Sequence, residues 1–278
     1  MQIRPHNSHF FNRAGKAERL SFDGPMVRGG QEDSRYRFGI DRLSRLSQIE
    51  RTHFWFVGRR ALIGRLLRKY LGDKAKLVLD LGCGTGMMVD VLMRQGYQVL
   101  GLDLRPEGLY AIHKTLPRSW LLQAEATQLP LAENVFDVLL LLDVLEHVND
   151  QVLLREVHRV LRPGGLAMVT VPAMPWLWSS RDEAAGHLRR YTRRQLKSVL
   201  EKTGLRVEET LYYQCLFFPL ILFTRFLGHR RMASVNLEEQ PPQVLNALMT
   251  WISKLEVKLG SVVPWPWGST LVAACRRV

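Results

Sequence analysis

The chain has 278 residues, 46% of them hydrophobic and 23% charged, which suits one large α/β domain with additions better than two full-sized domains. This composition excludes a wholly disordered chain. Lys and Arg outnumber Asp and Glu by 39 to 26, a net charge of +13. That charge favours anionic partners such as phosphates, nucleic acid or an acidic lipid surface, but a basic surface with no specific partner fits it equally well.

Cysteine spacing and hydropathy bear on cellular location. The three cysteines, Cys83, Cys215 and Cys275, lie far apart and predict neither a disulfide framework nor a metal knuckle, so a reducing cytoplasm fits best. No stretch approaches the roughly 18 to 20 apolar residues of a membrane span. The N-terminus lacks the apolar core of a secretory signal, but its first acidic residue is Glu18, so an organelle-targeting segment stays open.

The N-terminal part predicts an arm followed by helices. Residues 1–40 carry scattered Gly, Pro, Asn, Ser and Arg without an apolar period, which is typical of a flexible arm. Over 41–72 apolar residues recur at helical spacing, which predicts two helices that form a lid on the following domain. The aromatic cluster His53–Phe56 lies between them.

From Lys76 onward, short apolar runs alternate with helical stretches, the pattern of repeated βα units and a largely parallel sheet. The main domain is therefore expected over 41–213, completed by 268–278. Strands are predicted near 76–82, 98–104, 119–125, 136–144, 165–172, 205–213 and 269–275, and helices near 85–95, 106–115, 150–161 and 193–203.

The segment 214–267 breaks this alternation and predicts a helical insertion before the last strand. It opens on the apolar run 216–223, continues through Arg225, Arg230 and Arg231, and shows a helical pattern around 241–259. The run with its arginines, 214–231, fits peripheral contact with a membrane surface or a cover over a greasy acceptor. A helical cap or a dimer interface fits equally well.

A glycine loop is the clearest functional signal. The apolar run Val78–Leu81 leads into Gly82, Gly84 and Gly86 and then a helix, an arrangement that lets a ligand approach the main chain. Asp103, at the end of the next strand, is placed to accept hydrogen bonds from ribose hydroxyls, although it would also suit a helix cap. The spacing Gly-x-Gly-x-Gly differs from the dinucleotide fingerprint Gly-x-Gly-x-x-Gly, so a pyrophosphate is disfavoured.

The stretch 78–86 resembles the first motif of class I S-adenosylmethionine-dependent methyltransferases. Further elements match that family in order over about 76–172 and are most similar to the type 11 group, which includes ubiquinone and menaquinone biosynthesis methyltransferases. The resemblance implies a Rossmann-like, seven-stranded, mostly parallel sheet with helices on both faces, and S-adenosyl-L-methionine as cofactor. The matching elements are Asp103, 123–126, 134–138, 143–148 and 159–165.

The resemblance also assigns cofactor-binding residues. One departure is Glu125, where Asp is usual; the contact to the adenine amine stays feasible. The assigned residues are Asp80, Gly82, Cys83, Gly84 and Gly86 at the methionyl part, Asp103 with Leu104 at the ribose, Glu125 and Ala126 at the adenine, and Asp143 beside the sulfonium.

Candidate catalytic residues follow the fourth strand. If the turn there is helical, Asp143, Glu146 and His147 share one face, and His147 is the best general base because its ordinary pKa is near neutrality. Alternatively, these three residues have a structural role, in which they orient the loop after the fourth strand and cap the next helix. Some members of the family that the sequence resembles bind a divalent cation with a similar motif. In this chain the corresponding ligands would be Asp143, Glu146, His147 and His187. Many relatives with this motif use no metal, and we do not expect one.

Acceptor-binding residues are predicted on both sides of the pocket: Phe54, Trp55, Trp178, Arg190 and Tyr191. Hydrophobic packing or a structural loop would also explain them. We predict methyl transfer to a small amphipathic or lipid-like acceptor, with O-methylation favoured. An RNA methyltransferase or a non-catalytic methyltransferase-like subunit is the alternative, but no RNA-binding module is recognisable and the arginines are dispersed. The sequence does not predict the oligomeric state.

Overall fold

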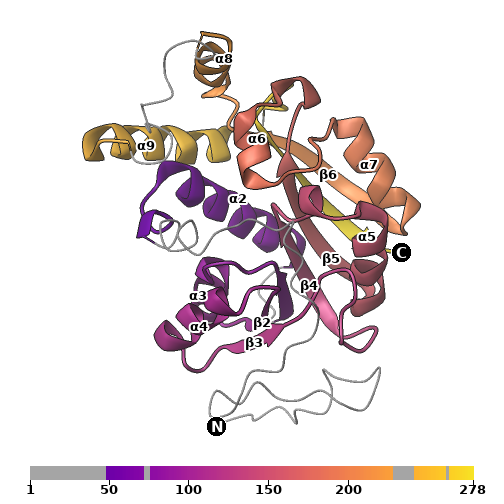
Figure 1. Ribbon diagram of the computed structural model, residues 1–278. Helices are drawn as coiled ribbons and strands as arrows, with labels where there is room; N and C mark the ends of the chain where they lie inside the picture. Colours follow the sequence, from indigo (N-terminus) through magenta and orange to yellow (C-terminus); the bar gives the residue numbers. More distant parts are fainter. Residues whose placement is uncertain (1–47, 72–75, 228–240, 261–262) are drawn as a thin grey trace.

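The computed structural model describes residues 48–71, 76–227, 241–260 and 263–278. The arm predicted over 1–40 lies outside the described residues, as does 41–47 of the expected lid. Figure 1 shows a central sheet with helices on both faces. Its strands are β1 (Leu77–Leu81), β2 (Gln98–Asp103), β3 (Trp120–Gln123), β4 (Phe136–Leu142), β5 (Leu161–Pro172), β6 (Leu205–Tyr213) and β7 (Thr270–Arg277).

The seven strands are ordered β3-β2-β1-β4-β5-β7-β6, which confirms the predicted mostly parallel sheet. Strands β1 to β5 pair in parallel, and β7 runs antiparallel between β5 and β6. The order reverses between β1 and β4, because β2 and β3 lie on one side of β1 and β4 on the other. Ligands bind at such a switch point, outside the carboxyl ends of the strands.

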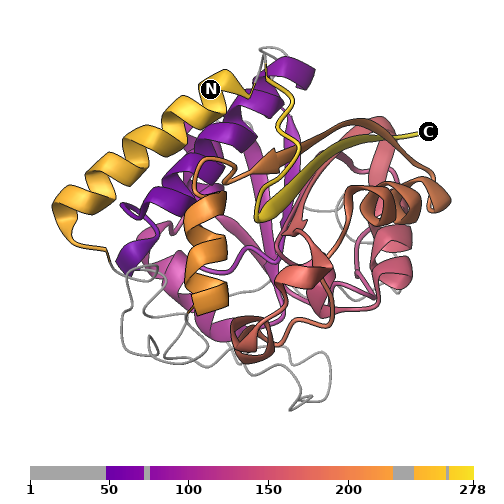
Figure 2. The same ribbon diagram turned by 90° about the horizontal axis from the view of Figure 1, so that it is seen from above.

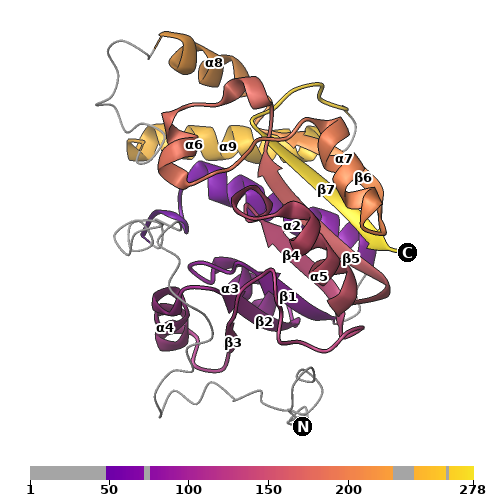
Figure 3. The same cartoon turned by 45° about the vertical axis from the view of Figure 1, so that its right-hand side comes forward.

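Helices cover both faces because the strands are apolar on both. Leu79 and Leu81 of β1 point to one face, and Val78 points to the other. The first face is covered by α5 (Asp150–Val160) and α7 (Arg193–Lys202), as Figure 3 shows from the side. The second face is covered by α2 (Phe54–Leu71), α3 (Met87–Arg94) and α4 (Pro106–Thr115).

The lid differs from the expectation at its aromatic cluster. Phe54–Phe56 form the first turn of α2 instead of linking two helices. Phe54 is buried and its ring lies 5.2 Å from that of Phe217, so this residue of the cluster packs inward.

The segment 214–267 contributes two helices, α8 (Phe218–Leu227) and α9 (Gln243–Leu259). Figure 2 shows α9 lying along α2. The two helices approach closely at Gly58, where a Cβ atom would lie 2.8 Å from that of Ser253 and 2.1 Å from the hydroxyl of Tyr213. Among the described residues, no helix combines the length and apolar character needed to cross a bilayer.

Candidate functional site

A cavity of about 510 Å³ opens at the carboxyl ends of β1, β2 and β4. Its wall combines three segments that lie apart in the sequence: the glycine loop, the turn after β4, and the lid. The glycine loop and the turn after β4 meet because β1, β2 and β4 are parallel and end at one edge of the sheet, at the switch point.

The glycine loop is fastened to β2 and leaves its backbone open to the cavity. Backbone N–H groups of Gly82 and Cys83 donate to the carbonyl of Leu102 at 2.8 and 3.0 Å. Gly84 has φ +53°, and a Cβ atom there would meet nothing closer than a backbone oxygen at 4.0 Å. Gly86 does not line the cavity; a Cβ atom there would lie 2.5 Å from the side chain of Ile112, so this glycine serves packing.

Asp103 lines the cavity and also holds the loop. Its Oδ2 accepts from the N–H of Gly84 at 2.9 Å, and its Oδ1 accepts from the N–H of Arg105 at 3.0 Å. Burial raises the pKa of Asp103 above its ordinary value, and these two hydrogen bonds act in the opposite direction. Each carboxylate oxygen retains a lone pair for a further donor from the cavity.

Asp80 is buried behind the loop and does not line the cavity. Its Oδ2 makes no hydrogen bond with the protein. Burial raises the pKa of Asp80 to about 7, although the nearby Arg59 guanidinium opposes the shift. An unpartnered buried carboxylate is costly, so this one calls for a cationic or hydrogen-bond-donating partner.

Leu104, Glu125 and Ala126 also line the cavity. The resemblance assigns Leu104 to the ribose and the other two to the adenine. Glu125 is exposed, and its Oε1 accepts from the hydroxyl of Thr127 at 2.6 Å. Its second oxygen remains available for a donor entering the cavity.

The lid supplies two charged residues that the sequence analysis missed, Glu50 and Arg59, and both line the cavity. Arg59 is buried and forms an ion pair with Asp143; its Nη2 lies 3.8 Å from Glu50. Its guanidinium also lies 4.4 Å from the centre of the Trp55 ring. The spacing of Trp55 and Arg59, four residues apart on one helix, was the signal available in the sequence.

Asp143 lines the cavity but does not belong to the turn that carries Glu146 and His147. The turn after β4 is a short 3₁₀ helix, Leu145–His147, and Asp143 precedes it with φ +58°. Asp143 therefore does not share a helical face with Glu146 and His147. It pairs with Arg59 and accepts from the hydroxyl of Thr170 at 2.9 Å.

Glu146, His147 and His187 do come together, and all three line the cavity. One ligand-type atom from each lies within 4.8 Å of the other two. His187 Nδ1 lies 2.9 Å from Asp182, and His147 Nδ1 lies 3.2 Å from the carbonyl of Gly186. If each Nδ1 donates, the Nε2 atoms keep their lone pairs.

Glu146 is fully buried, and neither of its carboxylate oxygens has a hydrogen-bond partner among the residues that the structure describes. Burial, with a contribution from Asp143, raises the pKa of Glu146 well above its ordinary value. The Nε2 of His187 lies 3.9 Å away, too far for a hydrogen bond. This group is chemically suited to moving protons, and its donor set would also suit a cation bound by two imidazoles and one carboxylate.

The predicted acceptor residues divide into two sets. Trp55 and Arg190 line the cavity, and Arg190 is fixed by two hydrogen bonds to Asp182, at 2.8 and 3.0 Å. Hydrogen bonds from His187 and Arg190 hold the pKa of Asp182 below its usual range despite burial. The others lie outside the wall: Phe54 against Phe217, Trp178 beside Glu183, and Tyr191 bonded to Asp150.

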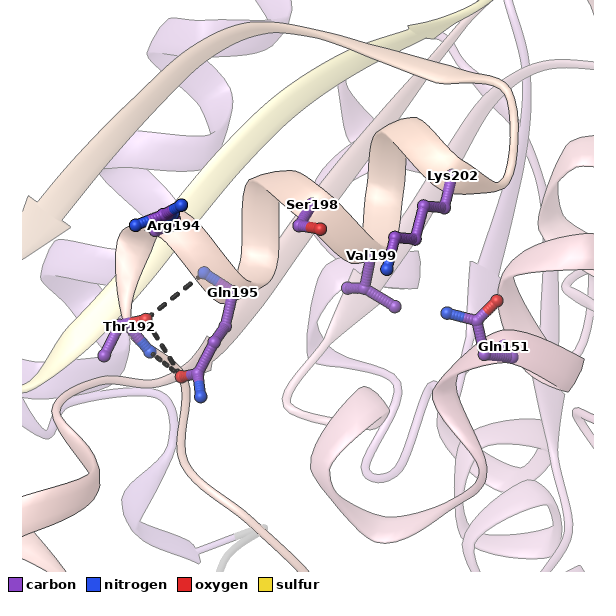
Figure 4. Close-up of a pocket in the computed structure, with 7 residues that line it drawn as sticks. All are labelled: Gln151, Thr192, Arg194, Gln195, Ser198, Val199 and Lys202. Carbon is purple, nitrogen blue, oxygen red and sulfur yellow. Dashed lines mark hydrogen bonds between the residues drawn. The ribbon is translucent and has the colours of Figure 1, made fainter.

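A second hollow, of about 370 Å³, lies along α7 and is shown in Figure 4. Its hydrogen bonds join Thr192 and Gln195, which together cap the N-terminus of α7. The hollow contains no carboxylate or imidazole, and the glycine loop takes no part in it. It therefore lacks the groups that the first cavity brings together.

Comparison with known proteins agrees with this geometry. Residues 79–169 match the family model of a methyltransferase domain. Over 162 residues the chain is 31% identical to a probable S-adenosylmethionine-dependent methyltransferase of Mycolicibacterium smegmatis; the match covers 57% of this chain and 62% of that protein. The chain thus spans less than two thirds of this relative's length.

Two solved structures show the same fold. An S-adenosylmethionine-dependent methyltransferase from Mesorhizobium loti has a TM-score of 0.54 at 20% identity, covering 78% of this chain and 98% of that one. The 1,6-didemethyltoxoflavin-N1-methyltransferase of Burkholderia thailandensis, solved with its substrate and S-adenosylhomocysteine, has a TM-score of 0.50 at 19% identity. That match covers 85% of this chain and 88% of the other.

Proposed function

We propose that this chain, whose residues 79–169 belong to the methyltransferase domain family, binds S-adenosyl-L-methionine and transfers its methyl group to a small acceptor. One observation carries the proposal. A single cavity is lined by the glycine loop and Asp103 and by Glu146, His147 and His187. Nucleoside-binding groups and proton-transfer groups therefore face one space.

The residues present fit this cofactor. Its amino-acid part has an ammonium and a carboxylate. The guanidinium of Arg59, in the cavity wall, would meet the carboxylate, and the carboxylate of Asp80, buried behind the loop, would favour the ammonium through its charge. Asp103 would accept from the ribose hydroxyls, beside Leu104, and Glu125 with Ala126 would meet the adenine. Gly82, Cys83 and Gly84 line the cavity and would face the methionyl part, and Asp143, which also lines it, would lie near the sulfonium.

When bound, S-adenosylmethionine supplies a methyl group that needs little activation, so the protein's task is to orient the acceptor and receive its proton. His147 is the proposed base, because it lines the cavity, its Nδ1 faces the carbonyl of Gly186, and its ring lies 4.9 Å from that of His187. Glu146 and His187 are the proposed neighbours that receive or stabilise the proton.

The acceptor we propose is amphipathic or lipid-like and is methylated on oxygen. Trp55, Phe56 and Val148 give one part of the cavity wall an apolar surface, and Arg190 adds a fixed cation. Leu216 and Leu220, in the segment 214–231, are exposed, which suits peripheral contact with a membrane.

Calorimetry with S-adenosylmethionine tests the cofactor assignment. We expect the intact chain to bind it and Asp103→Ala to bind at least about tenfold more weakly, because the variant loses a charged acceptor for the ribose. Absence of binding to the intact chain would overturn the proposal. Strongly salt-dependent binding of polynucleotide would point instead to an RNA acceptor.

A further inference from the structure

The helix α9 buries several polar side chains against the protein and exposes most of its large apolar side chains. Asn246 accepts from the N–H of Phe54 at 2.9 Å and donates to the carbonyl of Thr52 at 2.9 Å. Glu256 is buried and accepts from the N–H groups of Cys215 and Leu216 at 3.0 and 3.1 Å. These polar residues attach the helix to α2 and to the start of α8.

The opposite face of α9 carries an apolar stripe at helical spacing, which we call the outer stripe. Val244 is 85% exposed, Leu248 53%, Trp251 62% and Leu259 39%. The half-buried Leu255 continues the row between Trp251 and Leu259. Leaving such large side chains in water is unfavourable, and a continuous exposed row of them indicates a surface that binds something.

The charges beside the outer stripe identify its partner. Lys254 and Lys258 are exposed and lie one helical turn apart along it. Glu256 is the acidic residue of this helix, and it is buried on the inner face. Among the residues of α9 itself, the exposed face therefore combines apolar and positively charged side chains, and the carboxylate of the helix is on the inner face. A second copy of this helix would bring lysines toward lysines, whereas an anionic lipid surface complements both features.

We infer that α9 lies on the surface of an anionic lipid bilayer, with its outer stripe inserted among the headgroups. The helix is 17 residues long and does not qualify as a membrane span, which agrees with a position in the plane of the interface. Its N-terminal half lies beside the start of α2, where Trp55 and Phe56 line the cavity. A bilayer under α9 would thus lie near the acceptor side of the cavity.

Further exposed apolar residues lie near α8. Leu216 precedes this helix and Leu220 lies within it, and the exposed Trp176 lies with its ring 6.0 Å from that of Phe218. Figures 1 and 3 show α8 and α9 at the same end of the molecule. The inference does not require the proposed methyl transfer, so vesicle binding is measured without cofactor or acceptor.

The test is sedimentation of the full chain with vesicles of phosphatidylcholine alone or mixed with phosphatidylglycerol. We expect binding to the mixed vesicles that weakens with salt. Lys254→Gln and Lys258→Gln should each weaken binding about fivefold. Trp251→Ser should weaken it at least about tenfold through lost apolar burial. Matched controls are Val152→Ser on α5 and Lys197→Gln on α7, which change exposed residues away from α9 and should leave binding unchanged.

A second measurement follows the position of Trp251 itself. Brominated phosphatidylcholine in the mixed vesicles should quench part of the tryptophan fluorescence, and Trp251→Phe should clearly reduce this quenching while binding persists. Absence of sedimentation with either vesicle would overturn the inference. So would equal weakening by the two control variants, or a dimer of the intact chain that Trp251→Ser dissociates, since the latter would assign the stripe to a second copy.

Discussion

Arg59, from the lid helix α2, forms an ion pair with Asp143 at the end of β4, and this pair closes one side of the cavity. The guanidinium is also stacked on Trp55, and its Nε is buried without a hydrogen-bond partner. The guanidinium therefore has more N–H donors than its described protein partners accept. It is positioned to bind a carboxylate that enters the cavity.

Replacement of Arg59 by Gln should weaken S-adenosylmethionine binding about 10- to 100-fold, because a hydrogen bond between charged groups contributes about 1.5–3 kcal/mol. Calorimetry measures the change. Arg65→Gln is the matched control: Arg65 lies on the same helix and bonds to the carbonyl of Val257, away from the cavity. Equal loss of affinity in the two variants would show that the effect comes from loosening α2.

The role of Arg59 illustrates which features a sequence reveals. The glycine loop, Asp103 and the βα alternation were predictable because each is a local pattern with a fixed backbone consequence. Arg59 reaches Asp143 only through the packing of α2 on the sheet, and no local pattern specifies that contact. The left-handed backbone at Asp143 was equally hidden, and it separates this residue from Glu146 and His147.

Aromatic residues were the least predictable part of the site. Phe54, Trp55 and Phe56 are consecutive, yet Phe54 packs on Phe217 while Trp55 and Phe56 line the cavity. Tyr191 is likewise buried and bonded to Asp150. Aromatic side chains serve a core and a ligand equally well, so only the direction of each side chain distinguishes the two roles.

Cofactor affinity should depend on pH through Asp80. The pKa of Asp80 is raised to about 7 in the free protein, so the group is protonated below that pH. A cofactor ammonium beside it would favour the ionised form and lower this pKa in the complex. Binding then releases a proton, and the Kd should fall by up to about tenfold per unit as pH rises toward 7 and level off above it.

The Asp80→Asn variant should lose most of this pH dependence, since its side chain does not titrate. Calorimetry at several pH values on both sides of neutrality, repeated in buffers of different ionisation enthalpy, measures both the slope and the protons released. A variant that kept the slope of the intact chain would assign the titration to another group.

His147→Ala should lower kcat about 10²- to 10⁴-fold, the range for loss of a general base, and leave the Kd for S-adenosylmethionine unchanged. The first measurement is transfer of a labelled methyl group from S-adenosylmethionine to compounds in an organic-solvent extract of cells, which identifies the acceptor. The kinetics of the intact chain and of the variant are then measured with that acceptor. Full turnover by the variant would remove His147 from the mechanism. His158→Ala is a matched control, because His158 lies on α5 and does not line the cavity.

Chelation separates the two chemistries that Glu146, His147 and His187 permit. If these residues move protons, dialysis against EDTA should leave the transfer rate unchanged. A rate that fell on dialysis and recovered with one divalent cation would instead assign the group as a metal site. His187→Gln should then lower affinity for that cation in a direct titration, whereas it has no cation affinity to lower in the proton-transfer case.

Gly84→Ala should separate the ligand-binding role of the loop from its backbone strain. Gly84 has φ +53°, so an alanine there costs about 1–2 kcal/mol of folding stability from backbone conformation alone. Gly96→Ala is the matched control, because Gly96 has φ +87° and open surroundings and is not part of the cavity wall. Both variants should lower the Tm by a similar amount.

Only Gly84→Ala should also raise the Kd for S-adenosylmethionine, because its new methyl group would occupy space at the cavity wall that the protein itself leaves open. Calorimetry at a temperature where both variants are fully folded makes the comparison. Equal affinities of the two variants would mean that the cofactor does not lie against Gly84. The loop at Gly84 would then face a different ligand, even though the N–H of Gly84 donates to Asp103, the residue assigned to the ribose.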